Sequence, residues 1–266
     1  MRSRCTKDYF KMKLFSKIYG EGNNELIIIH GLFGMSDNWN SLGKVFSKDY
    51  KTHLIDLRNH GRSPHSEEFN YHVMCEDLLE YIIDQEIQNP IILGHSLGGK
   101  VAMKFAFTYP ERIKKLIVID ISPREYNSDF AYRILQVLYN LPLEDFSTRN
   151  EIENVLASFY SDKGLIFFLL KNLYRNQNKE FAWRFNLNVL LEKVDQIQEA
   201  SFINGVCEVP SYFLRGENSN YINDNDRELI SQHFSNSIVD TIEKAGHWVH
   251  VDNTEEFISR ILRFLR

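Results

Sequence analysis

The sequence predicts an α/β fold in which a mostly parallel, twisted sheet is flanked by helices and interrupted by an inserted helical lid. Short, unbroken apolar runs recur along the first half of the chain, and amphipathic stretches with helical spacing separate them. A long aromatic-rich stretch then follows before the apolar runs resume. Unbroken apolar runs are typical of strands covered on both faces, and their alternation with helices is typical of a parallel sheet. A chain of 266 residues can bury one such core.

The first half of the chain contains four of these apolar runs. We expect strands at 26–29, 53–55, 90–94 and 116–119. We expect the intervening helices at 41–46, 70–82 and 100–109. Asn70 is a suitable N-cap for the second helix, and Pro110 ends the third. These elements form the first part of a parallel sheet.

The middle of the chain differs from both ends. From 123 to 207 the pattern is helical and rich in aromatic residues, and no strand is expected there. The sheet pattern resumes with strands at 210–214 and 238–241 and helices at 224–234 and 257–265. We therefore divide the chain into a core, residues 1–122 and 208–266, and an inserted helical lid, residues 123–207, that lies over the sheet edge.

Composition narrows the classes of function. The net charge of −5, from 31 basic and 36 acidic residues, provides no basic surface for nucleic acid, and the apolar runs are too short to span a membrane. The first residues lack the apolar core of a secretory signal. We expect a cytoplasmic protein, a monomer or homodimer, that acts on a small molecule.

Neither the cysteines nor the early histidines are arranged as a metal site. Three cysteines, at 5, 75 and 207, are odd in number and widely spaced, so we expect reduced thiols. The histidines at 53, 60, 65 and 72 lack the spacing of known zinc motifs. We expect neither a metal nor a cofactor.

The pentapeptide Gly94-His95-Ser96-Leu97-Gly98 directly follows a predicted strand and precedes a predicted helix. A serine on a sharp strand-to-helix turn needs neighbours without side chains two residues before and after it, because a Cβ there would collide with the turning backbone. Glycine fills both positions. Ser96 is therefore the candidate nucleophile.

A serine nucleophile needs an imidazole as base, and the G-x-S-x-G hydrolases place that histidine last in the chain. Only His233, His247 and His250 lie late enough. His233 falls inside a predicted helix, whereas His247 follows the last predicted strand in a loop of small residues. We assign the base to His247 and a surface or packing role to His250.

The acid that orients the base has more than one candidate. Asp120 stands at the carboxyl end of a predicted strand, where functional side chains collect in parallel sheets. Glu217 and Asp224 follow the next strand, but the loop position at which many proteins of this architecture carry aspartate is Ser219. A serine cannot balance an imidazolium charge. We favour Asp120 over Glu217 and Asp224.

Backbone amides are expected to stabilise the negative charge that develops on the substrate oxygen. The amide of Leu97, one residue after the nucleophile, is the first candidate. The second comes from the glycine-rich loop after the first predicted strand, where we choose Leu32 over Phe33 and also expect Phe33 to contact substrate. We expect structural roles for His30, which would hold this loop, and for the turn-rich segment 56–64.

Several motifs occur together in a characteristic order. They are HGLFG, DLRNHGRSPH, GHSLGGK, VIDISP, RGENSNYI and AGHWVHVDNTEEF. With these motifs the chain resembles the α/β-hydrolase superfamily, and more closely the small bacterial YbfF-type esterases. The resemblance implies an α/β-hydrolase fold, an acid at Asp120, a histidine supported by Ser219, and activity on short acyl esters or acyl-CoA thioesters.

We therefore expect a serine hydrolase that cleaves carboxylic esters or thioesters through an acyl-enzyme, and whose aromatic lid favours apolar acyl groups. Two alternatives stay open. The same fold and residues serve C–C bond hydrolases, lyases and acyltransferases, and a lidded pocket could also bind a small ligand without catalysis.

Overall fold

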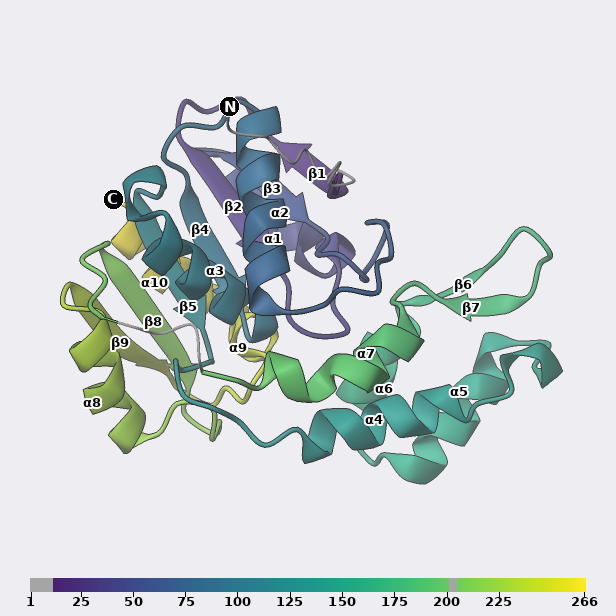
Figure 1. Ribbon diagram of the computed structural model, residues 1–266. Helices are drawn as coiled ribbons and strands as arrows, with labels where there is room; N and C mark the ends of the chain where they lie inside the picture. Colours follow the sequence, from purple (N-terminus) through teal and green to yellow (C-terminus); the bar gives the residue numbers. More distant parts are fainter. Residues whose placement is uncertain (1–11, 201–204) are drawn as a thin grey trace, which may run out of the picture.

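The computed structural model describes residues 12–200 and 205–266. The described residues form a seven-stranded sheet with the order β1-β3-β2-β4-β5-β8-β9. Every neighbouring pair is parallel except β1 with β3, which is antiparallel. The α/β-hydrolase fold, with a mostly parallel sheet flanked by helices, is confirmed (Figure 1).

The strands of this sheet are short, and most are bounded by helices. They are β1 (Ser16–Tyr19), β2 (Glu25–Ile29), β3 (Lys51–Ile55), β4 (Ile91–His95), β5 (Lys115–Ile119), β8 (Ser211–Gly216) and β9 (Ser237–Ile242). The helices that belong with it are α1 (Asn40–Phe46), α2 (Tyr71–Asp84), α3 (Leu97–Thr108), α8 (Asp224–His233), α9 (Val249–Asp252) and α10 (Thr254–Leu265). The edge strand β1 was not expected, because its sequence SKIY is only partly apolar.

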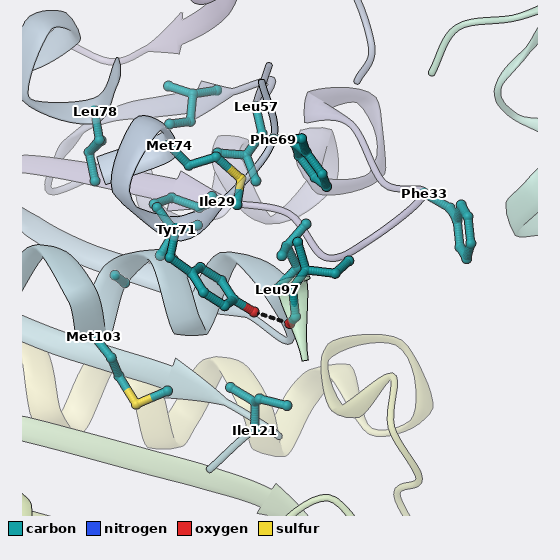
Figure 2. Close-up of a cluster of buried hydrophobic side chains, with 14 of the residues drawn as sticks. Ile29, Phe33, Leu57, Phe69, Tyr71, Met74, Leu78, Leu97, Met103 and Ile121 are labelled. Atoms are coloured by element: carbon teal, nitrogen blue, oxygen red, sulfur yellow. Dashed lines mark hydrogen bonds between the residues drawn. The ribbon is translucent and has the colours of Figure 1, made fainter. Parts of the chain in front are cut away.

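Alternating side chains of each strand enter two separate cores. In β2, Ile27 and Ile29 belong to the core that includes side chains of α2, α3 and α8, whereas Leu26 and Ile28 belong to the core that includes side chains of α1 and α10. Both faces of the sheet are therefore covered, which explains the unbroken apolar runs. Figure 2 shows part of the first core, where Met74 and Leu78 of α2 lie near Ile29.

The inserted region, residues 123–207, contains α4 (Asp129–Tyr139), α5 (Arg149–Phe159), α6 (Lys163–Leu170) and α7 (Leu187–Lys193). It also contains a hairpin of β6 (Leu173–Arg175) and β7 (Phe181–Trp183), so the expectation of no strand there was wrong. The hairpin escaped detection because each strand has only three residues. In Figure 1 α7 comes nearest to the sheet, α5 lies farther from it, and the hairpin extends away from the sheet.

Candidate active site

Ser96 occupies the turn between β4 and α3 with φ 52° and ψ −118°. This is a backbone conformation that a non-glycine residue rarely adopts. A Cβ on Gly94 would lie 2.2 Å from the carbonyl oxygen of Gly98, and a Cβ on Gly98 would lie 2.5 Å from that of Ile29. Both contacts are sterically impossible, so the two glycines permit the turn that presents Ser96.

His247 and Asp120 are brought together from opposite parts of the chain. Asp120 directly follows β5 and is fully buried, and its Oδ2 lies 2.7 Å from Nδ1 of His247. The hydroxyl of Ser219 donates a hydrogen bond to the same Oδ2, and the amide of Gly216 donates to Oδ1 at 3.0 Å. Three hydrogen-bond partners thus fix the orientation of this buried carboxylate.

The two alternative carboxylates lie elsewhere. Glu217 accepts a hydrogen bond from the amide of Lys244 at 2.8 Å, which ties two surface loops together. The side chain of Asp224 is 95 % exposed at the start of α8 and contacts arginine side chains. Within the described part of the chain, neither carboxylate contacts His247.

The other late histidines occupy the places their sequence context suggested. His233 ends α8 and bonds the carbonyl of Gly205 at 3.0 Å. His250 is buried and stacks on Trp39, with ring centroids 4.1 Å apart and planes 13° apart. Burial lowers the pKa of His250 to about 3, which keeps its ring neutral. The packing role expected for His250 agrees with this geometry.

Two neighbours position His247, and the sequence reasoning missed both. Nε2 of His95 lies 2.9 Å from the carbonyl oxygen of His247 and anchors its backbone. Tyr221 stacks on the imidazole, with ring centroids 3.9 Å apart and planes 19° apart. Tyr221 carries no sequence signal except its place two residues after Ser219.

The loop after β2 turns back towards Ser96. The amide of Gly34 bonds the carbonyl of Gly31 at 2.9 Å, and Phe33 has φ 61° within this turn. Among the residues described, the amides of Leu32 and Leu97 form no hydrogen bond within the protein. Both amides are therefore available to a ligand oxygen, as the two predicted donors require.

Asn172, which lies between α6 and β6 in the inserted region, holds the loop after β2 by a hydrogen bond. Its Nδ2 donates to the carbonyl oxygen of Phe33 at 2.7 Å, although the two residues lie 139 positions apart. Both this contact and the positive φ of Phe33 determine where the loop amides point. Sequence analysis could not find Asn172, because an asparagine in an aromatic helical stretch carries no specific signal.

The hydrogen bonds of His30 agree with the structural role expected for it. Its Nδ1 donates to the carbonyl of Gly31 at 2.8 Å, and its Nε2 accepts the amide of Leu57 at 3.0 Å. Complete burial lowers the pKa of His30 to about 4. The ring therefore stays neutral and links the loops that follow β2 and β3.

The segment 56–64 is held by charge pairs in the manner expected of a structural loop. Asp56 accepts the amides of Ser36 at 2.5 Å and Arg62 at 2.8 Å. Arg58 forms a buried bidentate ion pair with Asp77, in which Nε lies 2.6 Å from Oδ2 and Nη2 lies 2.7 Å from Oδ1. Asp56 and Arg58 are thus bound by the protein itself, which agrees with the structural role expected of this loop.

Two cavities meet at His247. One of about 100 Å³ is lined by Ser96, Leu32, Leu97 and apolar side chains of the inserted region. Figure 2 shows Tyr71, Leu97 and Ile121, three of its walls. The other, of about 840 Å³, is lined by His247, Trp248 and His250 among others.

Ser96 and His247 share the smaller cavity, but no hydrogen bond joins them within the described residues. Such contacts are often long without substrate and tighten when it binds. The side chains of Phe33 and Leu97 also line this cavity, which agrees with the substrate contact expected of Phe33.

Residues 12–200 and 205–266 contain no group of three or more metal-binding side chains that could hold an ion, and no helix among them could cross a membrane. Cys75 and Cys207 are buried free thiols. Cys5 lies outside the described residues, as does the N-terminal segment considered for a secretory signal.

Comparison with known proteins identifies the family. Residues 24–254 match the family model for the alpha/beta hydrolase fold. The chain belongs to the α/β-hydrolase family. The match covers both parts of the core and the inserted region between them, which includes every candidate residue of the site.

Relatives within this α/β-hydrolase family are named as enzymes that act on esters. Esterase YbfF of Escherichia coli is 31 % identical over 91 % of this chain and 93 % of its own. The sn-1-specific diacylglycerol lipase of Danio rerio is 34 % identical over 93 % of this chain and 80 % of its own. A solved structure, "Marine microorganism esterase", matches with TM-score 0.92 and 38 % identity over 95 % of this chain and 99 % of that one. These relatives and the fold support an ester hydrolase.

Proposed function

We propose that this protein hydrolyses carboxylic esters or acyl-CoA thioesters through an acyl-enzyme formed on Ser96. The observation that carries the proposal is the pair of buried Asp120 and partly exposed His247, with Oδ2 and Nδ1 2.7 Å apart, beside the cavity that Ser96 lines. An imidazole oriented in this way can remove the serine proton and then return it to the leaving group.

Each step assigns a role to one group. Oγ of Ser96 attacks the carbonyl carbon while its proton passes to Nε2 of His247, and Asp120 stabilises the imidazolium through Nδ1. The amides of Leu32 and Leu97 bind the oxyanion. His247 then protonates the departing alcohol or thiol, and water releases the acyl group by the reverse sequence. Ser219 supports Asp120 by its hydrogen bond.

A fluorophosphonate probe tests the nucleophile directly. We expect the wild-type protein to form a covalent adduct and to hydrolyse p-nitrophenyl butyrate and butyryl-CoA in separate assays. Ser96→Ala should lose both labelling and turnover, while its circular dichroism spectrum and melting temperature remain those of the wild type. Labelling that persists in Ser96→Ala would refute the assignment.

Other members of this fold use the same residues for acyl transfer or C–C bond hydrolysis. Analysis of the products distinguishes these reactions from ester hydrolysis. Ester hydrolysis yields the free acid, whereas an acyltransferase yields a new ester when an alcohol is supplied. Labelling at Ser96 without hydrolysis of any ester or thioester would favour acyl transfer or C–C bond hydrolysis. Absence of labelling together with tight binding of an apolar ester would favour a binding protein.

A further inference from the structure

The side chain of Lys100 forms a charged part of the wall of the smaller cavity. Lys100 lies one turn after Ser96 in α3, and its amide bonds the carbonyl of Ser96 at 3.1 Å. The residue is only 1 % exposed, yet it lines the cavity together with Ser96 and Leu97. An ammonium in this position is unusual, because the other walls are mostly apolar.

The buried ammonium of Lys100 has neutral partners. Nζ donates to the carbonyls of Gln198 at 3.0 Å and Glu199 at 2.8 Å. It also lies 4.9 Å from the ring centroid of Tyr126 and 5.7 Å from that of Tyr71. Within the described residues it forms no ion pair with a carboxylate. An ammonium has three donors, so one remains after the two carbonyls.

A buried ammonium whose direct hydrogen-bond partners are neutral carbonyls is costly, and the protein bears this cost beside its candidate nucleophile. Burial lowers the pKa of Lys100 to about 7, and Arg124 lowers it further. The carboxylates of Glu125 and Glu199 act on this pKa in the opposite direction without forming a direct ion pair with Lys100. If Lys100 only held the backbone at Gln198 and Glu199, a neutral donor could form the same hydrogen bonds without the desolvation cost of a buried ammonium. The charge therefore points to an anionic ligand in the cavity.

The two cavities can be assigned to the two halves of an ester. His247, which must protonate the leaving group, lines both cavities, but only the smaller one is also lined by Ser96, Leu32 and Leu97, so we place the leaving group in the larger cavity. The carbonyl oxygen must face the amides of Leu32 and Leu97. The acyl chain then enters the smaller cavity, whose walls include Ile121, Lys100 and Leu97.

The position of Lys100 limits the length of the acyl group. Lys100 is four positions after Ser96, which corresponds to a rise of about 6 Å between the two backbone positions along the helix axis. The cavity of about 100 Å³ is also small. A chain of about three methylene groups between the ester carbonyl and a terminal carboxylate spans a distance of this order.

We propose that Lys100 determines specificity by binding a carboxylate at the far end of a short acyl group. The preferred substrates would then be half-esters or half-thioesters of short dicarboxylic acids, with the methylene chain against the apolar walls. This inference rests on the proposed function, since it assumes that the acyl group is transferred to Ser96.

A pair of esters of equal shape tests the inference. Monoethyl glutarate carries a terminal carboxylate, and ethyl 5-methylhexanoate replaces that carboxylate with an isopropyl group. We expect the wild type to show at least about tenfold higher kcat/KM on the charged ester. Lys100→Met should lower the charged-to-neutral ratio of kcat/KM at least about thirtyfold, mainly through KM, and Lys100→Arg should retain more of the ratio.

Lys104→Met is the matched control, because Lys104 lies one turn further along α3 and does not line the cavity. Its ratio should equal that of the wild type. The inference is overturned if the wild type prefers the neutral ester, or if Lys100→Met lowers both activities equally, as loss of a purely structural anchor would. If Lys100→Met does not fold, the wild-type ratio alone decides.

Failure of the inference differs from failure of the proposed function. Hydrolysis of ethyl 5-methylhexanoate with no preference for the charged ester would overturn the role of Lys100 and leave the hydrolase intact. Absence of both hydrolysis and fluorophosphonate labelling at Ser96 would overturn the proposed function itself.

Discussion

Asp120 combines complete burial with three donors on its carboxylate, and its charge should matter more than its shape. Asp120→Asn keeps the size of the side chain but removes the charge that stabilises protonated His247. We expect kcat to fall by about 10³- to 10⁴-fold, on the scale known for this change in serine proteases. Glu217→Gln and Asp224→Asn should retain nearly full activity. A loss confined to either of these two variants would move the acid role away from Asp120.

Ser219 has the smaller, supporting role. Its hydroxyl donates to Oδ2 of Asp120 and accepts the amide of Tyr221 at 3.2 Å. Hydrogen bonds to charged groups contribute about 1.5–3 kcal/mol, so Ser219→Ala should lower kcat about ten- to a hundredfold. Steady-state kinetics with p-nitrophenyl butyrate measures this, and Ser235→Ala in an exposed turn is the control. Unchanged kcat in Ser219→Ala would show that the hydroxyl is dispensable.

At the scale of elements, the inserted region contributes to the geometry of the core as well as covering it. Asn172→Ala removes the bond from this region to the carbonyl of Phe33 and leaves the loop after β2 freer to move. We expect kcat to fall about tenfold with little change in KM, because the loop amides act mainly in the transition state. The melting temperature should fall by only a few degrees, in line with about 1 kcal/mol for one hydrogen bond.

Asn140→Ala is the control for the Asn172 experiment, since Asn140 caps α4 on an exposed surface of the same inserted region. If both asparagine variants alter kcat equally, or if Asn172→Ala changes only KM, the proposed link between the inserted region and the oxyanion loop is wrong.

Most elements of the core could be predicted because each has a simple physical signal. Strands buried on both faces are continuous apolar runs, and α2 shows both its N-cap, Asn70, and its helical stripe. The starts of helices were less certain. We expected α3 from residue 100, but it begins at Leu97, since Gly98, one of the two glycines that permit the turn at Ser96, is also part of the helix.

The site was predictable only where a residue type is chemically necessary. Ser96, Asp120 and His247 follow from the need for a nucleophile, an acid and a base in a known chain order. Tyr221 and Asn172 act through a ring stack and a long-range hydrogen bond. No local pattern encodes such contacts, because they depend on how distant segments pack.

At the scale of the whole molecule, buried neutral histidines make stability depend on pH. Burial lowers the pKa of His30 to about 4, and of His60 and His250 to about 3. Below pH 6.5 the unfolded chain takes up protons that these folded rings do not, so stability falls as pH decreases from 6.5 towards 3. Each such group costs about 1.4 kcal/mol per pH unit within that window.

His250→Phe should reduce this dependence while keeping the stack on Trp39. Between pH 6 and pH 4 we expect its free energy of unfolding to fall about 2–3 kcal/mol less than that of the wild type, as measured by urea unfolding at each pH. His72→Phe, at an exposed position of α2, should retain the wild-type slope. Parallel curves for His250→Phe and wild type would show that His250 titrates in the folded state as it does in the unfolded chain.

The most direct test of the account is the mass of the protein during turnover. Acid quenching within the first turnovers of p-nitrophenyl acetate, followed by peptide mass spectrometry, should reveal one added acetyl group on the peptide that contains Ser96. Asp120→Asn should form the same adduct more slowly. An unmodified Ser96 during continuing, Ser96-dependent hydrolysis, or an acetyl group on another residue, would contradict the acyl-enzyme on which the account depends.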